Sequence, residues 1–492
     1  MHKPKDLIGY MNYKMMGRFI AQILSIEGIF MIPPLFISLS CGDPMAVKGF
    51  LVSILVTVIL VAVLFLICRG APSVFNAKAG LVCVGISWIV LSLVGSLPFY
   101  ISGEIEGYIN CFFEIVSGFT TTGASIVPSV EALSKGILYW RSFSHWLGGM
   151  GVLVFLLAFT GEKGQGFTMH LLRAESPGPN VGKLVPKMRK TASILYLIYI
   201  GLTVLNILFL LLGGMSLFES VCTAFGTAGT GGFGIKNDSL ASYSPYLQNV
   251  TTVFMALFGV NFSCYYLLLI RQWKSVALDE EVHTYLGIIL ASTLLIAWNI
   301  RGLYGSLGET LRHAAFQVSS IITTTGFATT DFDLWPAFSK TILLCLMVIG
   351  ACAGSTGGGL KVARFLLIFK GLRRNIRQML QPRNVELIRN NGEIVDEKIL
   401  SNTNAYLAAY VMILVTIFLL LSLDGFSVET NLSATLATFN NIGPGLDAVG
   451  PTCNFSAYSN FSKLILSFSM LAGRLEIFPI LVLFTRRTWA RH

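Results

Sequence analysis

The chain has 492 residues, of which 54% are hydrophobic and 12% are charged, with a mean hydropathy of +0.71 and a formal net charge of +10. Soluble domains carry about 25% charged residues, so this composition excludes an ordinary soluble protein. The sequence contains no nucleophile elbow, P-loop or dinucleotide-binding fingerprint, which argues against an enzyme. We therefore expect an all-α polytopic membrane protein without catalytic activity.

Ten apolar stretches are candidate membrane spans, because about 20 apolar helical residues cross about 30 Å of hydrocarbon. The first, at 19–40, follows a basic segment but lacks the small-residue cleavage site of a signal peptide, so we expect it to be retained. The others are expected at 49–68, 79–101, 138–159, 192–213, 248–270, 284–303, 337–370, 403–423 and 461–485.

The basic residues lie in alternate loops. Segments 1–18, 69–78, 161–190, 271–274, 361–400 and 486–491 hold 26 of the 35 Lys and Arg residues. By the positive-inside rule these segments and both termini are cytoplasmic. Topology thus explains the charge without a nucleic-acid partner. The segment KGLRRNIRQML (370–380) is also suited to contact lipid headgroups or a cytosolic protein.

The opposite loops repeat one pattern four times. FEIVSGFTTTG (113–123) aligns without a gap to FQVSSIITTTG (316–326), and FESVCTAFGTAGTGGFG (218–234) and LSATLATFNNIGPGL (432–446) occupy equivalent places between apolar stretches. Such a period indicates repeats of span, short helix, glycine turn and span around one pseudo-fourfold pore. We expect two leading helices at 1–70 and repeats at 71–165, 166–275, 276–385 and 386–492.

A short helix of about 10 residues reaches only about 15 Å, so each loop must re-enter and leave on the same face. Extended Thr-Thr-Gly backbone can present carbonyl oxygens that replace the hydration shell of a cation, and glycine permits the backbone angles that this requires. The ion is the substrate, and no organic cofactor is expected. The candidate filter residues are Thr121, Thr122 and Gly123; Thr230, Gly231 and Gly232; Thr324, Thr325 and Gly326; and Asn441, Ile442 and Gly443. In the second repeat Gly229 is an alternative to Gly232.

Two further features fall inside predicted spans. GACAGSTGGGLK (350–361) is either a small-residue packing face or a broken helix whose Gly357, Gly358 and Gly359 form a loop that obstructs the pore. Arg474 lies about 18 Å along a helix from the next arginine, well inside the bilayer. It is either a gating cation at the cavity wall or a partner of Glu476 or another carboxylate.

The fourfold plan resembles the Trk/Ktr/HKT superfamily of potassium transporters along essentially the whole chain, and the two leading spans resemble its bacterial TrkH/TrkG type. The motifs that carry the resemblance are TTTGAS, GTGGFG, TTTGFATTDF, NNIGPGL, GSTGGGLKVAR and GRLEIFPILVLF. The resemblance implies potassium as the transported ion, a homodimer with one pore per subunit, a cytosolic nucleotide-binding ring of the TrkA type, and location in the bacterial inner membrane. It also implies that Gly123 favours potassium over sodium.

Tetrameric potassium channels have a second filter glycine two residues on, whereas two of the four positions here hold Ser125 and Ala328. We therefore expect a less stringent filter. The expected function is potassium uptake through a gated pore. The alternative is a symporter coupled to protons or sodium, which needs intramembrane carboxylates; Glu27, Glu114 and Glu219 are the candidates.

Overall fold

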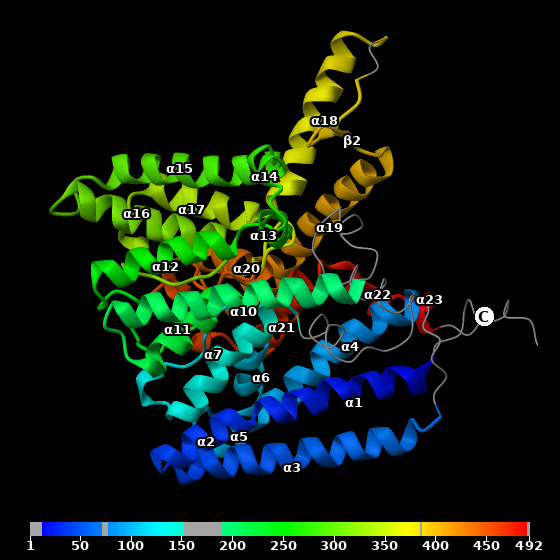
Figure 1. Cartoon of the computed structure of the whole chain (residues 1–492), viewed down its shortest axis with the longest axis vertical. Coiled ribbons are helices and arrows are strands. Elements are labelled where there is room, and N and C mark those ends of the chain that lie inside the picture. The colour runs from blue at the N-terminus through cyan, green and yellow to red at the C-terminus, as the bar shows by residue number, and fades with distance from the viewer. Residues whose placement is uncertain (1–11, 71–76, 152–187, 384–385, 490–492) are drawn as a thin grey trace, which may run out of the picture.

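The computed structural model describes residues 12–70, 77–151, 188–383 and 386–489. In these ranges the chain is a bundle of helices (Figure 1), and the one sheet is the short antiparallel pair of β1 (Arg389–Asn390) and β2 (Glu393–Ile394). The beginning of α1 (Tyr13–Phe30) and the last described helix, α23 (Arg486–Trp489), lie at the same end of the bundle, on the right of Figure 1. The predicted all-α class is confirmed.

The leading helices are α1, α2 (Ile32–Cys41) and α3 (Pro44–Ile67). The first predicted span is divided between α1 and α2 at Met31, where Pro33 and Pro34 remove backbone donors from the first turn of α2. Only five of the 24 residues of α3 are buried, and its exposed side chains are nearly all apolar, as expected of a helix that faces lipid. These helices form the two predicted leading spans.

Four units follow, each with a long helix, a short helix, a loop and then a second helix that is interrupted or shorter. The first contains α4 (Ala77–Gly95), α5 (Leu97–Ser102), α6 (Tyr108–Phe119) and α7 (Lys135–Gly149), and the second contains α10 (Met188–Leu212), α11 (Leu217–Gly229), α12 (Pro245–Phe258) and α13 (Phe262–Leu269). After α14 (Trp273–Ala277), the third contains α15 (Glu280–Ile300), α16 (Leu307–Ile322), α17 (Ala337–Ile349) and α18 (Val362–Leu380). The fourth contains α19 (Glu397–Leu421), α20 (Val428–Phe439), α21 (Asn460–Arg474) and α22 (Phe478–Phe484). The four-unit architecture predicted from the sequence is confirmed.

The short helices α6, α11, α16 and α20 are buried toward their C-terminal ends. Every residue in 113–119, 222–229, 316–322 and 433–439 is buried. Serine side chains cap the beginnings of α11, α16 and α20. At α11 the cap is a reciprocal box in which Glu219 takes part, which gives that carboxylate a structural role.

Fewer helices cross the molecule without interruption than the sequence predicted. Among the described residues, six are long and apolar enough to span a membrane, or seven if α12 and α13 count as one bent span. The predicted span at 138–159 is helical as far as Gly149, and its continuation from 152 lies outside the described residues.

The predictions of continuous spans at 248–270 and 461–485 were wrong. The first bends by 88° between α12 and α13, where the Asn261 side chain caps the new helix by accepting from Ser263 N. The second breaks between α21 and α22, where Glu476 and Ile477 have φ of 56° and 65°. No glycine marks that break, and a β-branched residue rarely adopts a left-handed backbone, so tertiary contacts override local preference there.

Candidate functional site

Each short helix ends in the same backbone motif. At the end of α6, Thr121 N donates to Gly118 O (3.1 Å) and Thr122 N donates to Ser117 O (2.8 Å). These two bonds define the Schellman motif, and both recur at the ends of α11, α16 and α20. The first N–H groups of the loop therefore point back toward the short helix. The carbonyl groups of the loop are left free to point away from that helix.

The motif places non-glycine residues in a left-handed backbone. Their φ values lie between 54° and 59° at Thr121, Thr230, Thr324 and Asn441. A left-handed backbone is rare for residues with a Cβ and costs about 1–3 kcal/mol each. Four such residues at equivalent positions show that the loops share one strained conformation.

Two residues further on, each loop has a glycine with positive φ: 81° at Gly123, 72° at Gly232, 84° at Gly326 and 100° at Gly443. Gly229, the alternative in the second repeat, is instead the last residue of α11. The backbone conformation therefore favours Gly232 as the equivalent of the other three glycines.

The four loops meet in a closed ring in chain order. A Cβ added to Gly123 would overlap Gly231 O, one on Gly232 would overlap Thr325 O, and one on Gly326 would overlap Ile442 O. The ring closes where a Cβ on Gly443 would lie 2.6 Å from Thr122 O. Each glycine thus lets the carbonyl of the neighbouring loop approach closely. The structure brings the predicted loops together at one place.

Four carbonyl oxygens at this ring accept no hydrogen bond from the part of the chain that the structure describes. Among the described residues, nothing donates a hydrogen bond to the carbonyl of Thr122, Gly231, Thr325 or Ile442, and these residues are buried. Buried carbonyl groups are nearly always paired, so four unpaired ones need an explanation. The C-terminal ends of the short helices add partial negative charge at the same place. A dehydrated monovalent cation fits this environment.

The 350–361 segment, hereafter the glycine loop, interrupts the third repeat between α17 and α18 and lies against the ring. Gly358 N donates to Thr324 Oγ1 (2.6 Å). Two backbone bonds join the loop to the bend of the second repeat: Cys352 N to Gly259 O (3.1 Å) and Phe262 N to Gly354 O (3.0 Å). The segment is a broken helix and not a continuous packing face.

Arg474 is the last residue of α21 and contacts the glycine loop directly. Its Nη1 donates to Thr356 O (2.8 Å), and its Nη2 donates to Gly149 O (2.6 Å) and to Gly148 O. The neighbouring carboxylate, Glu476, pairs with Arg364. The guanidinium therefore joins the glycine loop to the end of α7.

Sequence reasoning missed two residues that hold the same loop. Glu281, in the first turn of α15, accepts from Ala353 N (2.5 Å), inside the loop, and from Ala363 N (3.2 Å), just after it. Lys361 Nζ donates to Gly357 O. Glu281 precedes the predicted span at 284–303, and an acidic residue is common in the first turn of a helix. Lys361 was assigned only to the cytoplasmic basic residues. No local signal marked either residue.

A buried ion pair supports the first two loops. Arg141 Nε lies 2.6 Å from Glu114 Oε1, and Arg141 Nη1 donates to Gly234 O (2.9 Å). Glu114 in turn accepts from Ser125 Oγ and Ile126 N, both at 2.9 Å. The pair thus contacts the segments that follow both Gly123 and Gly232.

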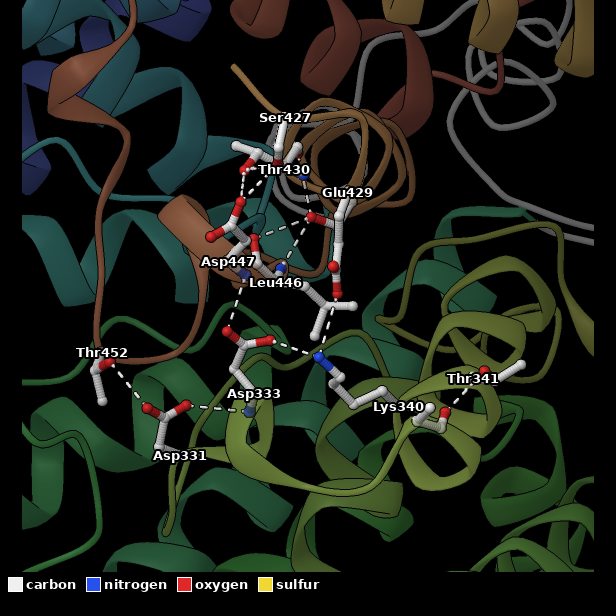
Figure 2. A network of polar contacts seen from close by, with 12 residues as sticks. Asp331, Asp333, Lys340, Thr341, Ser427, Glu429, Thr430, Leu446, Asp447 and Thr452 are labelled. Atoms are coloured by element: carbon white, nitrogen blue, oxygen red, sulfur yellow. Dashed lines mark hydrogen bonds and ion pairs between the residues drawn. The ribbon is translucent and has the colours of Figure 1, made fainter.

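Beyond the ring, polar contacts join the third and fourth repeats (Figure 2). Asp333 Oδ1 pairs with Lys340 (3.3 Å), and its Oδ2 accepts from Asp447 N (3.2 Å). The Asp447 carboxylate accepts from Ser427 Oγ (2.6 Å) and Thr430 Oγ1 (2.5 Å). These hydroxyl groups lower the pKa of Asp447. The network fixes the loops that leave the ring.

The fold and the ring define a multi-span helical membrane protein whose four repeats each bring one loop to a common centre. The chain belongs to the TrkH family of cation transport proteins, whose family model matches residues 47–305 and 303–489. This family consists of transporters and not enzymes, as the sequence indicated.

Individual relatives match over nearly their whole length. The "Trk system potassium uptake protein TrkH" of Salmonella typhimurium is 35% identical over 486 residues, which cover 97% of this chain and 100% of that protein. The "Trk system potassium uptake protein TrkG" of Escherichia coli is 31% identical over 469 residues, 92% of this chain and 96% of that protein. The crystal structure of the potassium transporter TrkH from Vibrio parahaemolyticus has 30% sequence identity and a TM-score of 0.88, and the match covers 98% of this chain and 100% of that one.

Proposed function

We propose that the protein takes up potassium through a gated pore whose selectivity filter is the ring of four loops. The observation that supports this best is the set of four buried carbonyl groups at the ring, which accept no hydrogen bond within the described residues. Potassium is the cation that the names of the Salmonella and Escherichia coli relatives specify. The ring then supplies backbone oxygens in place of water.

The bound ion would contact the residues predicted from the sequence. These are Thr121, Thr122 and Gly123; Thr230, Gly231 and Gly232; Thr324, Thr325 and Gly326; and Asn441, Ile442 and Gly443. The residues two beyond the glycines differ among the repeats and include Ser125 and Ala328, which supports a filter less strict than that of tetrameric channels. Each of the four repeats, with the boundaries given above, contributes one quarter of the site.

The glycine loop is proposed as the gate. Gly357, Gly358 and Gly359 are its mobile part, and Arg474 holds it in the closed position. The hydrogen bond from Gly358 N to Thr324 Oγ1, next to the ring, supports this assignment. Its bonds to Glu281 and Arg474 are polar contacts that can break and reform without disturbing the apolar core. Opening then requires displacement of one loop and not of whole repeats.

One observation favours a second candidate function, a symporter coupled to protons or sodium. Glu27 of α1 is 2% exposed, and among the described residues neither of its carboxyl oxygens has a hydrogen-bond partner. Of the other two carboxylates considered, Glu114 pairs with Arg141 and Glu219 caps α11. Glu27 is therefore the residue through which coupling would act.

Flux into liposomes separates the two functions. A membrane potential contributes about 2.3 kcal/mol per charge per 100 mV, so a pore accumulates potassium by about 50-fold at 100 mV and no further. We expect accumulation that follows the potential and is unchanged by a pH or sodium gradient. Accumulation above that limit with either gradient, abolished by Glu27→Gln, would support the symporter. Absence of potassium flux in the intact protein contradicts both.

We propose that the protein lies in the bacterial inner membrane with both termini in the cytoplasm. The described ends of the chain lie at the same end of the bundle, and the basic loops are those assigned to that side by the positive-inside rule. Labelling of single cysteines introduced at position 3 and near 491 with an impermeant reagent tests this. Protection of both in intact cells is expected, and labelling of either one contradicts the orientation.

We propose that the protein forms a homodimer through α18, which projects from the bundle (Figure 1). Its apolar residues repeat at intervals of four and three and are 42–82% exposed: Phe365, Phe369, Leu372, Ile376 and Met379. This spacing is typical of helices that pair with a second copy. Light scattering should show a dimer for the native chain and a monomer for Ile376→Glu. A dimer that persists in the variant would assign the interface elsewhere.

The names of the relatives refer to a Trk system, which supports the proposal that the protein works together with other proteins. A cytosolic nucleotide-binding ring of the TrkA type is the proposed partner, and the arginine-rich face of α18 is suited to it and to anionic lipid headgroups.

A further inference from the structure

In the first and third repeats, a pair of hydrogen-bonded threonines stabilises the loop. Thr120 Oγ1 lies 2.8 Å from Thr122 Oγ1, and Thr323 Oγ1 lies 2.7 Å from Thr325 Oγ1. In each pair, the first threonine also donates to a carbonyl of its own short helix. Each pair ties the residue before the filter glycine to the end of that helix.

The second repeat has no such pair. Glycines occupy both equivalent positions, at Gly229 and Gly231. A Cβ on Gly231 would overlap the imidazole ring of His145, and one on Gly229 would overlap the backbone carbonyl of the same residue. His145 belongs to α7 of the first repeat and is fully buried. The imidazole therefore fills the space that threonine side chains take in the first and third repeats.

His145 also makes hydrogen bonds that fix the loop. Its Nε2 lies 3.2 Å from Phe233 N, the residue after the filter glycine Gly232, and its Nδ1 lies 2.8 Å from Gly118 O in α6. A backbone N–H can only donate and a carbonyl can only accept, so the imidazole carries its proton on Nδ1 and accepts at Nε2. Its ring also packs against that of Phe233, with centroids 4.2 Å apart. One side chain thus links the filter of the second repeat to the short helix of the first.

The Arg141–Glu114 pair adds a second tether on the same side. The Arg141 guanidinium lies 3.6 Å from the centre of the Phe233 ring and donates to Gly234 O. His145 and Arg141 lie four residues apart, on one face of α7. The loop of the second repeat is therefore held by a neighbouring repeat, at two consecutive residues past its glycine.

We propose that His145 determines ion specificity as a positioning residue, by holding the loop of the second repeat in the conformation that the threonine pairs impose on the first and third. This inference rests on the proposed function, because it assigns the ring as the filter. If the bond from Phe233 N is lost, the backbone after Gly232 can relax and the carbonyl of Gly231 leaves its place in the ring. A ring with one mobile oxygen discriminates less well between potassium and the smaller sodium ion.

Three substitutions separate the two hydrogen bonds. His145→Gln places an acceptor near the position of Nε2 and retains the bond from Phe233 N. His145→Asn places a donor near the position of Nδ1 and retains only the bond to Gly118 O. His145→Leu retains neither. We expect the sodium-to-potassium permeability ratio in liposomes to rise about fivefold for Asn and Leu and to stay near the native value for Gln. This fold-change corresponds to about 1 kcal/mol, the usual net contribution of one hydrogen bond.

His313→Asn is the matched control, since this buried histidine bonds to Thr329 Oγ1 and, within the described residues, forms no hydrogen bond with the filter residues. The ratio is independent of how much protein is active, so partial loss of folded protein does not obscure it. An unchanged ratio in all three His145 variants overturns the inference, as does an equal rise in Gln and Asn. Loss of folded protein in all three also overturns it, because the side chain would then be required for the fold as a whole.

A parallel measurement on Gly123→Ser distinguishes this failure from that of the proposed function. If Gly123→Ser alters the ratio while the His145 variants do not, only the inference about His145 fails. If neither alters it, the ring is not the filter.

Discussion

Removal of the Arg474 side chain should open the pore. The guanidinium holds the glycine loop through a hydrogen bond from Nη1 to Thr356 O at 2.8 Å, and its Nη2 contacts the end of α7. A hydrogen bond with a charged donor contributes about 1.5–3 kcal/mol. If about 2 kcal/mol holds the loop closed, its loss raises the ratio of displaced to closed loop by about 30-fold. The cation also repels potassium, by about 3 kcal/mol at an illustrative 6 Å and an effective dielectric constant of about 20.

Loss of the hydrogen bond and loss of the repulsion both favour conduction. Arg474→Ala should therefore raise basal potassium flux by about 30-fold or more. Arg474→Lys keeps the charge but cannot reach Thr356 and α7 together, so its flux should be intermediate. The assay is potassium flux from liposomes, with the melting temperature measured on the same preparations. Arg301→Ala, an exposed arginine at the end of α15, is the control and should match the native protein.

The reasoning is refuted if Arg474→Ala is stable but conducts no faster than the native protein. A variant that melts earlier and conducts less would show that the guanidinium mainly stabilises the fold, by joining the glycine loop to the end of α7.

Four further outcomes are expected. Gly123→Ser should raise sodium permeation relative to potassium, since φ of 81° and the nearby Gly231 carbonyl both oppose a Cβ; unchanged competition between the two ions would contradict this. Deletion of Gly357–Gly359 should increase basal flux, and a folded but silent deletion variant would place the gate elsewhere. Glu281→Gln should weaken the acceptor for Ala353 N and Ala363 N and raise basal flux severalfold, whereas flux at the native level would show that the carboxylate does not hold the loop. The depressed pKa of Asp447 contributes stability that is present at neutral pH and declines as pH falls below about 4, so Asp447→Asn should lower the melting temperature more at pH 7 than at pH 3; an equal effect at both would be inconsistent with ionic stabilisation.

The sequence predicted the repeats because their signal is local and repeated. Three threonines and a glycine recur after equivalent apolar segments, and the same spacing identified Gly443, which follows Asn440, Asn441 and Ile442 instead of three threonines. The break at Glu476 and Ile477 could not be predicted, since neither residue favours a left-handed backbone and the conformation is imposed by surrounding packing. The role of His145 could not be predicted either, because it depends on a contact between residues far apart in the sequence. His145 forms no metal-ligand spacing with other histidines, and the glycine that accommodates its ring lies 86 positions further along the chain.

The closure of the ring in chain order has a consequence for biosynthesis. Asn441 Nδ2 donates to Thr122 Oγ1 across 319 positions of sequence, and Gly443 meets the loop that contains Gly123. The last repeat to leave the ribosome must therefore dock against the first, and contacts of such long range form late and slowly. Until then, three of the four loops hold their strained threonines without a closed ring. A nascent chain that stops before the fourth repeat would present unpaired carbonyl groups at membrane depth, a state that quality-control proteases are suited to remove.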